Sequence, residues 1–136
     1  MSEKAPPLRL AIRVRADVER ARRDVRAAAL ALGFLAVPTE EIVLAASELA
    51  TNLLLHAHDG TLAVTRAEAM GRVGVRIESR DAGPGIADIP AALRDGASTR
   101  RGLGSGLPAV RRLVDEFSLV SAPTGTVIAV CKWRPE

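Results

Sequence analysis

The sequence predicts an α+β fold, a two-layer sandwich in which a mostly antiparallel mixed sheet carries helices on one face. The chain holds both segments with apolar residues at every second position and segments with apolar residues at helical spacing, and most connections between the expected strands are short. Its 136 residues suffice for one hydrophobic core. We therefore expect a flexible N-terminus over residues 1–7 and a single domain over residues 8–136.

The N-terminal part of this domain is expected to form a strand and two helices. Residues 8–14 have apolar side chains at alternate positions, which indicates a strand with one covered face. A helix is expected from about Asp17 to Gly33, and a second helix should begin at Pro38 and Thr39. The expected core-facing residues are Val18, Ala21, Val25, Ala28 and Leu32 in the first helix, and Ile42, Ala45, Ala46, Leu49 and Leu53 in the second.

A hairpin should follow these helices. The turn Asp59-Gly60 ends the second helix, and strands are expected at about residues 61–69 and 72–80 with Met70-Gly71 between them. The region from Asp81 to Gly106 is rich in glycine and longer than most loops in compact domains. Loops of this length often serve a function, so this region is a candidate site.

The C-terminal part should contain a third helix and two closing strands. The strands are expected at about residues 118–122 and 126–133, with a turn through residues 123–125. The apolar residues of the helix are Leu107, Val110, Leu113, Val114 and Phe117.

Composition excludes several classes of protein. The net charge is +3, but 16 acidic residues are interleaved with 19 basic ones, and aromatic residues make up only 2% of the chain, so binding of nucleic acid through basic patches and base stacking is not expected. The single cysteine, Cys131, excludes an internal disulfide, and we expect it at a buried strand position. No stretch approaches the roughly 18 apolar residues of a membrane span. We expect a cytoplasmic protein that does not bind membranes.

Glu48 and Asn52 form the first candidate site. They are four residues apart in the second expected helix, so they lie about one turn apart on the same face. A carboxylate beside a carboxamide can supply a general base and a neutral oxygen ligand for Mg²⁺. The same spacing also fits two polar residues at the solvent edge of an amphipathic helix.

Asp81 and the glycines after it form the second candidate site. The segment Asp81-Ala82-Gly83-Pro84-Gly85-Ile86 directly follows an expected strand. Its glycines allow the backbone to approach a flat ligand, and the carboxylate can accept a hydrogen bond from an exocyclic amine such as that of adenine. A tight turn that uses glycine and proline only for conformation is the alternative.

A second glycine cluster precedes the third expected helix. Residues 102–107 read GLGSGL, and free backbone N–H groups at a helix N-terminus can bind phosphate. Arg100 and Arg101 add positive charge beside it. A flexible connection would also be rich in glycine. The cluster is not a P-loop, because no Gly-Lys-Ser/Thr ending is present, and it lacks the apolar strand that precedes a dinucleotide-binding G-x-G-x-x-G motif.

These segments together resemble the motifs of the GHKL (Bergerat-fold) ATPase and kinase superfamily. Glu48 and Asn52 within SELATN are similar to its N box, DAGPGI at 81–86 to its G1 box, GLGSGL at 102–107 to its G2 box, and Gly125-Thr126 to its closing glycine-threonine motif. Within the superfamily, SELATN, the terminal CKWR and the run DGASTRRGLGSGLPAVRRLVDEFSL resemble RsbT-like switch serine/threonine kinases more than anti-sigma kinases of the RsbW and SpoIIAB type.

The resemblance implies a set of site residues and two cofactors, ATP and Mg²⁺. Glu48 would be the catalytic base, Asn52 the Mg²⁺ ligand, and Asp81 the residue that binds adenine beside Thr126. The other residues implied at the nucleotide pocket and its lid are Gly83, Gly85, Ile86, Arg100, Arg101, Gly102, Leu103, Gly104, Ser105, Gly106 and Leu107. Arg100 and Arg101 depart from the family, where smaller residues are expected, so the charge of the lid and the affinity for ATP should differ.

The resemblance also implies a function and partners. The chain would be a serine/threonine kinase that phosphorylates a STAS-domain antagonist or scaffold, switches between partners in bacterial stress signalling that controls a sigma factor, and activates a PP2C-type phosphatase. Two alternatives stay open: an anti-sigma kinase that sequesters a sigma factor, and a non-catalytic ATP-gated binding module. The resemblance leaves open whether the chain forms a homodimer. His56 and His58 have too few partners at useful spacing for a metal site, and we expect them to be structural or surface groups.

Overall fold

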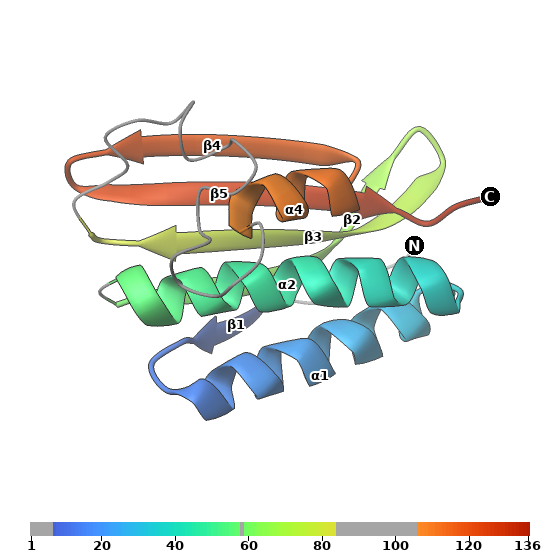
Figure 1. Ribbon diagram of the computed structural model, residues 1–136. Coiled ribbons are helices and arrows are strands. Elements are labelled where there is room, and N and C mark those ends of the chain that lie inside the picture. The colour runs from blue at the N-terminus through green and yellow to red at the C-terminus, as the bar shows by residue number, and fades with distance from the viewer. Residues whose placement is uncertain (1–6, 58, 84–105) are drawn as a thin grey trace.

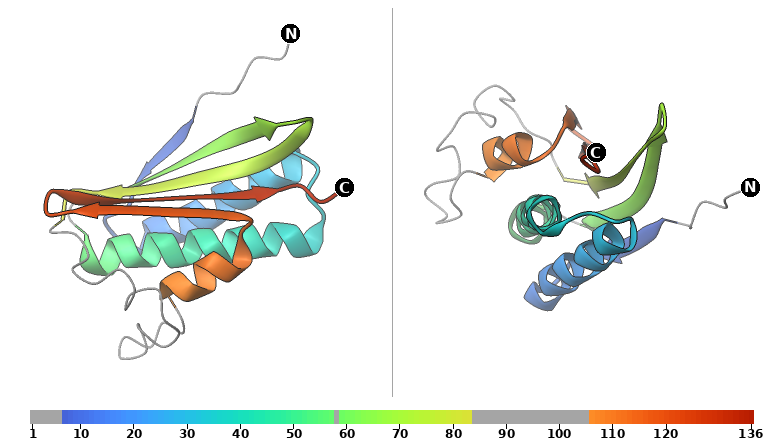
Figure 2. Two further views of the ribbon diagram at one scale, coloured as in Figure 1. Left: turned by 90° about the horizontal axis from the view of Figure 1, so that it is seen from above. Right: turned by 90° about the vertical axis from the view of Figure 1, so that its right-hand side faces the viewer.

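The computed structural model describes residues 7–57, 59–83 and 106–136, which form an antiparallel sheet with helices on one face (Figures 1 and 2). The strands are β1 (Leu8–Ala11), β2 (Thr61–Ala69), β3 (Arg72–Asp81), β4 (Glu116–Ala122) and β5 (Gly125–Trp133), in the spatial order β1-β2-β3-β5-β4. The helices are α1 (Arg15–Ala31), α2 (Ala36–His56) and α4 (Gly106–Leu113). The expected α+β sandwich is confirmed, and all neighbouring strands in this order pair antiparallel.

Helix α1 begins two residues before the expected start, and it ends just before Gly33, as the sequence predicted. Asp17 lies in the first turn, and its carboxylate accepts hydrogen bonds from the backbone N–H groups of Arg13 and Val14 at 2.8 and 3.0 Å. These bonds hold the pKa of the Asp17 carboxyl below its usual value. At the other end, Gly33 has φ +89°, and the N–H of Phe34 bonds to the carbonyl of Ala29 at 3.0 Å, which closes the helix in a Schellman motif.

Helix α2 packs between α1 and α4 and runs alongside the strands, so it is the central helix of the layer (Figure 1). It begins at Ala36 rather than at Pro38, because proline is tolerated in the first helical turn, where its missing N–H has no partner to lose. All five residues of its expected core stripe are buried. Glu40 binds Arg26 of α1 through two hydrogen bonds of 2.8 and 2.9 Å, which ties the two helices together at the surface.

The β2-β3 hairpin has the expected strands with Met70-Gly71 between them, but the C-terminal elements differ from expectation. Helix α4 ends at Leu113, and Phe117 lies in β4, opposite Val130 of β5, so the prediction that the helix carries Phe117 was wrong. The chain joins the sheet early because the backbone N–H of Asp115 donates to the Cys131 carbonyl at 2.9 Å. The turn between β4 and β5 contains only Pro123 and Thr124.

The core lies between the sheet and the helices and is aliphatic. Its largest fully buried apolar residues are Ile42, Leu49, Leu62, Ile77, Val25, Val43, Val75, Val110 and Val130. Cys131 is buried in β5, as expected. Burial, with the nearby carboxylates of Glu116 and Asp115, raises the pKa of its thiol to about 11, so the thiol stays protonated and unreactive at neutral pH. In the described part of the chain, no helix is long and apolar enough to cross a membrane.

Replacing Thr39 with valine is expected to raise the free energy of unfolding by about 1 kcal/mol. Thr39 is 1% exposed, and its Oγ1 has no hydrogen-bond partner among the described residues. Valine keeps the shape of the side chain and removes the buried hydroxyl. Urea denaturation measures the change, with Thr61→Val at an exposed position as the control. A loss of stability specific to the Thr39 variant would show that the hydroxyl is satisfied in the folded protein.

Candidate functional site

Helix α2 brings Glu48 and Asn52 to the side of the helix that approaches α4. Both residues are half-buried, and each is followed by a core leucine, Leu49 and Leu53, which fixes the rotation of the helix. The backbone N–H of Gly106, the first residue of α4, donates to the carboxylate of Glu48. The general-base candidate and the N-terminus of α4 therefore meet, although they are far apart in the sequence.

The environment of Glu48 suits a general base. Burial raises the pKa of its carboxyl above the usual value, and the Gly106 hydrogen bond partly offsets this rise. A carboxylate whose pKa is raised accepts a proton more readily than an exposed one. The Gly106 bond also orients the carboxylate, so it faces the α4 N-terminus, where backbone N–H groups favour a bound anion.

Asp81 and Thr126 lie side by side at the end of β3 and the start of β5, where they are register partners. Both side chains point to the helix-covered face, because they follow the alternation of the buried residues Ile77 and Ser79 in β3 and Ile128 in β5. The Asp81 carboxylate is oriented by the Gly83 backbone N–H, which donates to its Oδ1 at 2.7 Å. Asp81 and Thr126 are therefore close enough for one ligand to contact both side chains.

Ser121 belongs to this site and was missed by the sequence analysis. Its hydroxyl is 2.8 Å from that of Thr126, across the β4-β5 pair, so it fixes the orientation of the Thr126 side chain. The length of the β4-β5 turn is the sequence feature that could have identified Ser121. A two-residue turn at Pro123 and Thr124 places residues 121 and 126 opposite each other, whereas the expected three-residue turn does not.

Two glycines lie in close contact with other segments at this corner, and one of them is required there. A Cβ on Gly125 would collide with the backbone carbonyl of Asp81, so only glycine allows β5 to begin beside the end of β3. A Cβ on Gly83 would lie 3.1 Å from Oδ1 of Asp81 and 3.9 Å from the carbonyl oxygen of His56. The segment after β3 thus lies against the C-terminal end of α2, the helix that carries Glu48 and Asn52.

The remaining predicted site residues fall into two groups. Leu107, the second residue of α4, is buried in the core, where it holds the helix against α2. The others lie outside the described residues, and their roles stay predictions: Gly85, Ile86, Arg100, Arg101, Gly102, Leu103, Gly104 and Ser105. His56 is exposed at the end of α2, and among the described residues no group of three His, Cys, Asp or Glu side chains could hold a metal.

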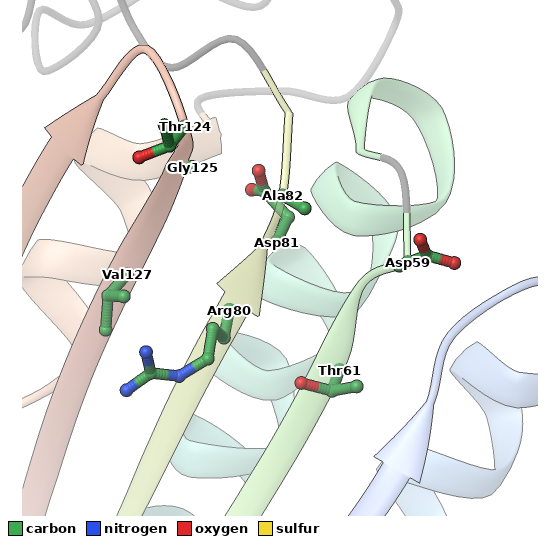
Figure 3. Close-up of a pocket in the computed structure, with 8 residues that line it drawn as sticks. All are labelled: Asp59, Thr61, Arg80, Asp81, Ala82, Thr124, Gly125 and Val127. Carbon is green, nitrogen blue, oxygen red and sulfur yellow. The ribbon is translucent and has the colours of Figure 1, made fainter.

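A cavity of about 470 Å³ lies at the same end of the sheet but on the opposite face (Figure 3). Thr61, Arg80 and Val127 line it, and these residues alternate with the core-facing ones in their strands. In Figure 3 they stand in front of the strands, with α2 behind. The cavity borders Asp81 and Gly125, and no residue of α2 lines it.

Comparison with known proteins gives two kinds of match. Residues 12–132 match the model of the family described as the histidine kinase-like ATPase domain. Among curated proteins, the chain is 46% identical over 118 residues to the serine/threonine-protein kinase RsbT of Bacillus subtilis (strain 168), which covers 86% of this chain and 89% of that protein.

A solved structure is similar in fold. The crystal structure of the RsbU and RsbW domains of a Mycobacterium tuberculosis protein matches 96% of this chain with a TM-score of 0.65 and 24% identity. This chain spans about a third of the length of that one, at 34%. At this identity the match bears on the fold alone.

Proposed function

Because this chain belongs to the family of histidine kinase-like ATPase domains, and so to the ATP-binding GHKL type, we propose that it is a serine/threonine protein kinase that works by partner switching in stress signalling. The finer proposal is that its substrate is a STAS-domain antagonist or scaffold and that it activates a PP2C-type phosphatase. The observation that carries the proposal is the hydrogen bond between Glu48 and Gly106, which brings a general base to a phosphate-binding helix end.

The described residues fit ATP. The carboxylate of Asp81 is held by the N–H of Gly83 and can accept a hydrogen bond from the exocyclic amine of adenine. Thr126 lies beside it with a hydroxyl that Ser121 orients. At the other end of the site, the N-terminus of α4 suits the negative phosphates. The family match and the kinase relative support ATP as the nucleotide.

The same residues fit Mg²⁺. Asn52 lies one turn beyond Glu48 on α2 and offers a neutral amide oxygen. Mg²⁺ in kinases and ATPases is commonly bound by one or two protein oxygens together with phosphate oxygens and water, so a single amide ligand is sufficient. We propose Asn52 as the protein ligand.

The described residues then perform distinct parts of phosphoryl transfer. Bound ATP with Mg²⁺ supplies the phosphoryl group and neutralises its charge. Glu48 orients the serine or threonine hydroxyl of the partner and takes its proton. The hydroxyl oxygen bonds to the γ-phosphorus while the bond to ADP breaks, which leaves a phosphorylated partner, ADP and a protonated Glu48. The Gly106 N–H holds the carboxylate in place during this step. We propose that residues 102–106 cover the triphosphate, as the family resemblance implies.

A phosphorylation assay tests the function. The purified protein is incubated with radiolabelled ATP, Mg²⁺ and a STAS-domain protein from the same organism, with the Glu48→Gln variant in parallel. Label on a STAS serine or threonine that is absent with the variant supports the proposal. Capture of a sigma factor would favour an anti-sigma kinase, and tight ATP binding without label would favour an ATP-gated binding module. Sedimentation of the same sample reports whether the chain forms a homodimer.

A further inference from the structure

Helix α2 has a line of exposed apolar side chains on the side away from the sheet. Val37, Leu44 and Leu55 are 70%, 51% and 44% exposed. At roughly 100° per residue these three lie within about 20° of one another around the helix, and the buried residues Ile42 and Leu49 lie on the opposite side. Figure 1 shows α2 between α1 and α4 with the sheet behind it, so this line forms the ridge of the helical layer.

Glu48 lies on the same ridge. It follows Leu44 by four residues and precedes Leu55 by seven, so its direction from the helix axis is within roughly 40° of both. Leu35, directly before α2, and Leu30, in the last turn of α1, are also exposed, at 76% and 54%. Single exposed leucines are ordinary at protein surfaces, whereas several along one helix form an apolar surface of the kind that interaction sites use.

We propose that this ridge, formed by Val37, Leu44 and Leu55 of α2, is the docking surface for the phosphoacceptor protein. The inference rests on the proposed kinase function, because only a protein substrate must place a hydroxyl at Glu48 and cover the surface around it. A specific interface buries about 800 Å² on each partner, a patch of roughly 16 Å radius. Centred on Glu48, such a patch includes Leu44 at about 6 Å and Leu55 at about 10.5 Å along the helix, and Val37 lies at its edge at about 16.5 Å.

The charges beside the ridge define the partner further. Helix α1 carries five arginines and three acidic residues, a net charge of +2, and α4 carries two arginines and no acidic residue, also +2. Helix α2 itself carries Glu40, Glu41 and Glu48 with no lysine or arginine, and Arg26 of α1 is paired with Glu40, so both signs of charge lie beside the ridge. The partner that fits has an apolar patch around its acceptor hydroxyl and a polar rim, with acidic groups on the side that faces α4.

The test compares a ridge variant with a matched surface variant. Leu44→Gln with Leu55→Gln makes the ridge polar without adding charge near Glu48, and Val120→Gln makes the same kind of change at a 68% exposed residue of β4, on the other face of the sheet. We measure ATP affinity, and the KM and kcat for phosphorylation of the STAS-domain protein. The ridge variant is expected to raise KM for the STAS protein by roughly tenfold or more, with ATP affinity and kcat unchanged.

The outcomes separate the two proposals. If the unmodified protein phosphorylates the STAS protein and the ridge variant has the same KM as the Val120 variant, the ridge is not the docking surface. A fall in kcat at unchanged KM would overturn the inference in the same way, since it would show an effect on chemistry rather than on docking. If the unmodified protein transfers no phosphate to the STAS protein, the proposed function fails first, and the docking inference falls with it.

Discussion

Replacing Glu48 with glutamine is expected to lower the rate of phosphoryl transfer by roughly 10²–10⁴-fold while leaving ATP affinity unchanged. The amide keeps the size of the side chain, and its oxygen can still accept the hydrogen bond from the Gly106 N–H, so the N-terminus of α4 stays in place. The amide cannot take a proton from the acceptor hydroxyl. Single-turnover transfer to the STAS protein and calorimetric titration with ATP measure the two quantities separately.

The pH dependence of the unmodified enzyme provides a second measure of the same residue. Burial raises the pKa of the Glu48 carboxyl above its usual value of 4.5, and the base works only when it is deprotonated. Activity should therefore fall as the pH drops through this raised pKa, which places the acid limb of the pH profile above 4.5. A glutamine variant that transfers phosphate at near-normal rates, or an acid limb at or below the ordinary value, would contradict the assignment of Glu48 as the base.

The proposed roles in phosphoryl transfer and in adenine binding lie at two different ends of the site. Variants at one end can therefore serve as controls for variants at the other. By our proposal, helix α2 carries the base, the metal ligand and the docking ridge, so changes on it should affect transfer and partner binding. The strand ends carry the groups that we propose for adenine. This separation follows from the fold, in which α2 packs beside α4 and the Asp81-Thr126 pair ends the central strands.

The sequence predicted those features of the fold and the site that depend on residues close together in the chain. It did not predict those that depend on contacts between distant segments. The Glu48-Asn52 pair depends only on helical spacing, and the sequence predicted it without any tertiary information. Phe117 was assigned to the wrong element because apolar residues at 110, 113, 114 and 117 fit a helix, while 117 and 119 also fit a strand. Two hydrogen bonds to β5 decide between them: the Trp133 N–H donates to the Asp115 carboxylate, and the Asp115 N–H donates to the Cys131 carbonyl. No local pattern shows these bonds.

The need for glycine at position 125 depends on a contact between distant segments of the chain. The sequence identified a glycine-threonine motif there, but the reason for the glycine is the carbonyl of Asp81, 44 residues earlier in the chain. Ser121 was missed because its role depends on the strand register, which changes with one residue in the turn. The contact between Glu48 and Gly106 was likewise outside local patterns, although each residue had been singled out separately.

Replacing Asp81 with asparagine is expected to weaken ATP binding by roughly 10- to 100-fold, because one buried hydrogen bond is replaced by an unfavourable contact. The asparagine Oδ1 can keep the 2.7 Å bond from the Gly83 N–H, so the turn is preserved. That orientation places the amide NH₂ where the carboxylate offers an acceptor, and a donor there meets the donor amine of adenine. The fold should be intact, since Asp81 is not part of the buried core.

Calorimetric titration with ATP measures the affinity of the Asp81→Asn variant, with the Glu48→Gln variant titrated under the same conditions as a control. The Asp81 variant should lose affinity and the Glu48 variant should keep it, while both lose phosphoryl transfer at limiting ATP. At saturating ATP the Asp81 variant should recover most of its transfer rate, because its base and its α4 N-terminus are unchanged. Equal ATP affinity in both variants and the unmodified protein would remove Asp81 from the adenine site, and a transfer rate that saturating ATP does not restore would show that Asp81 acts on the chemical step instead.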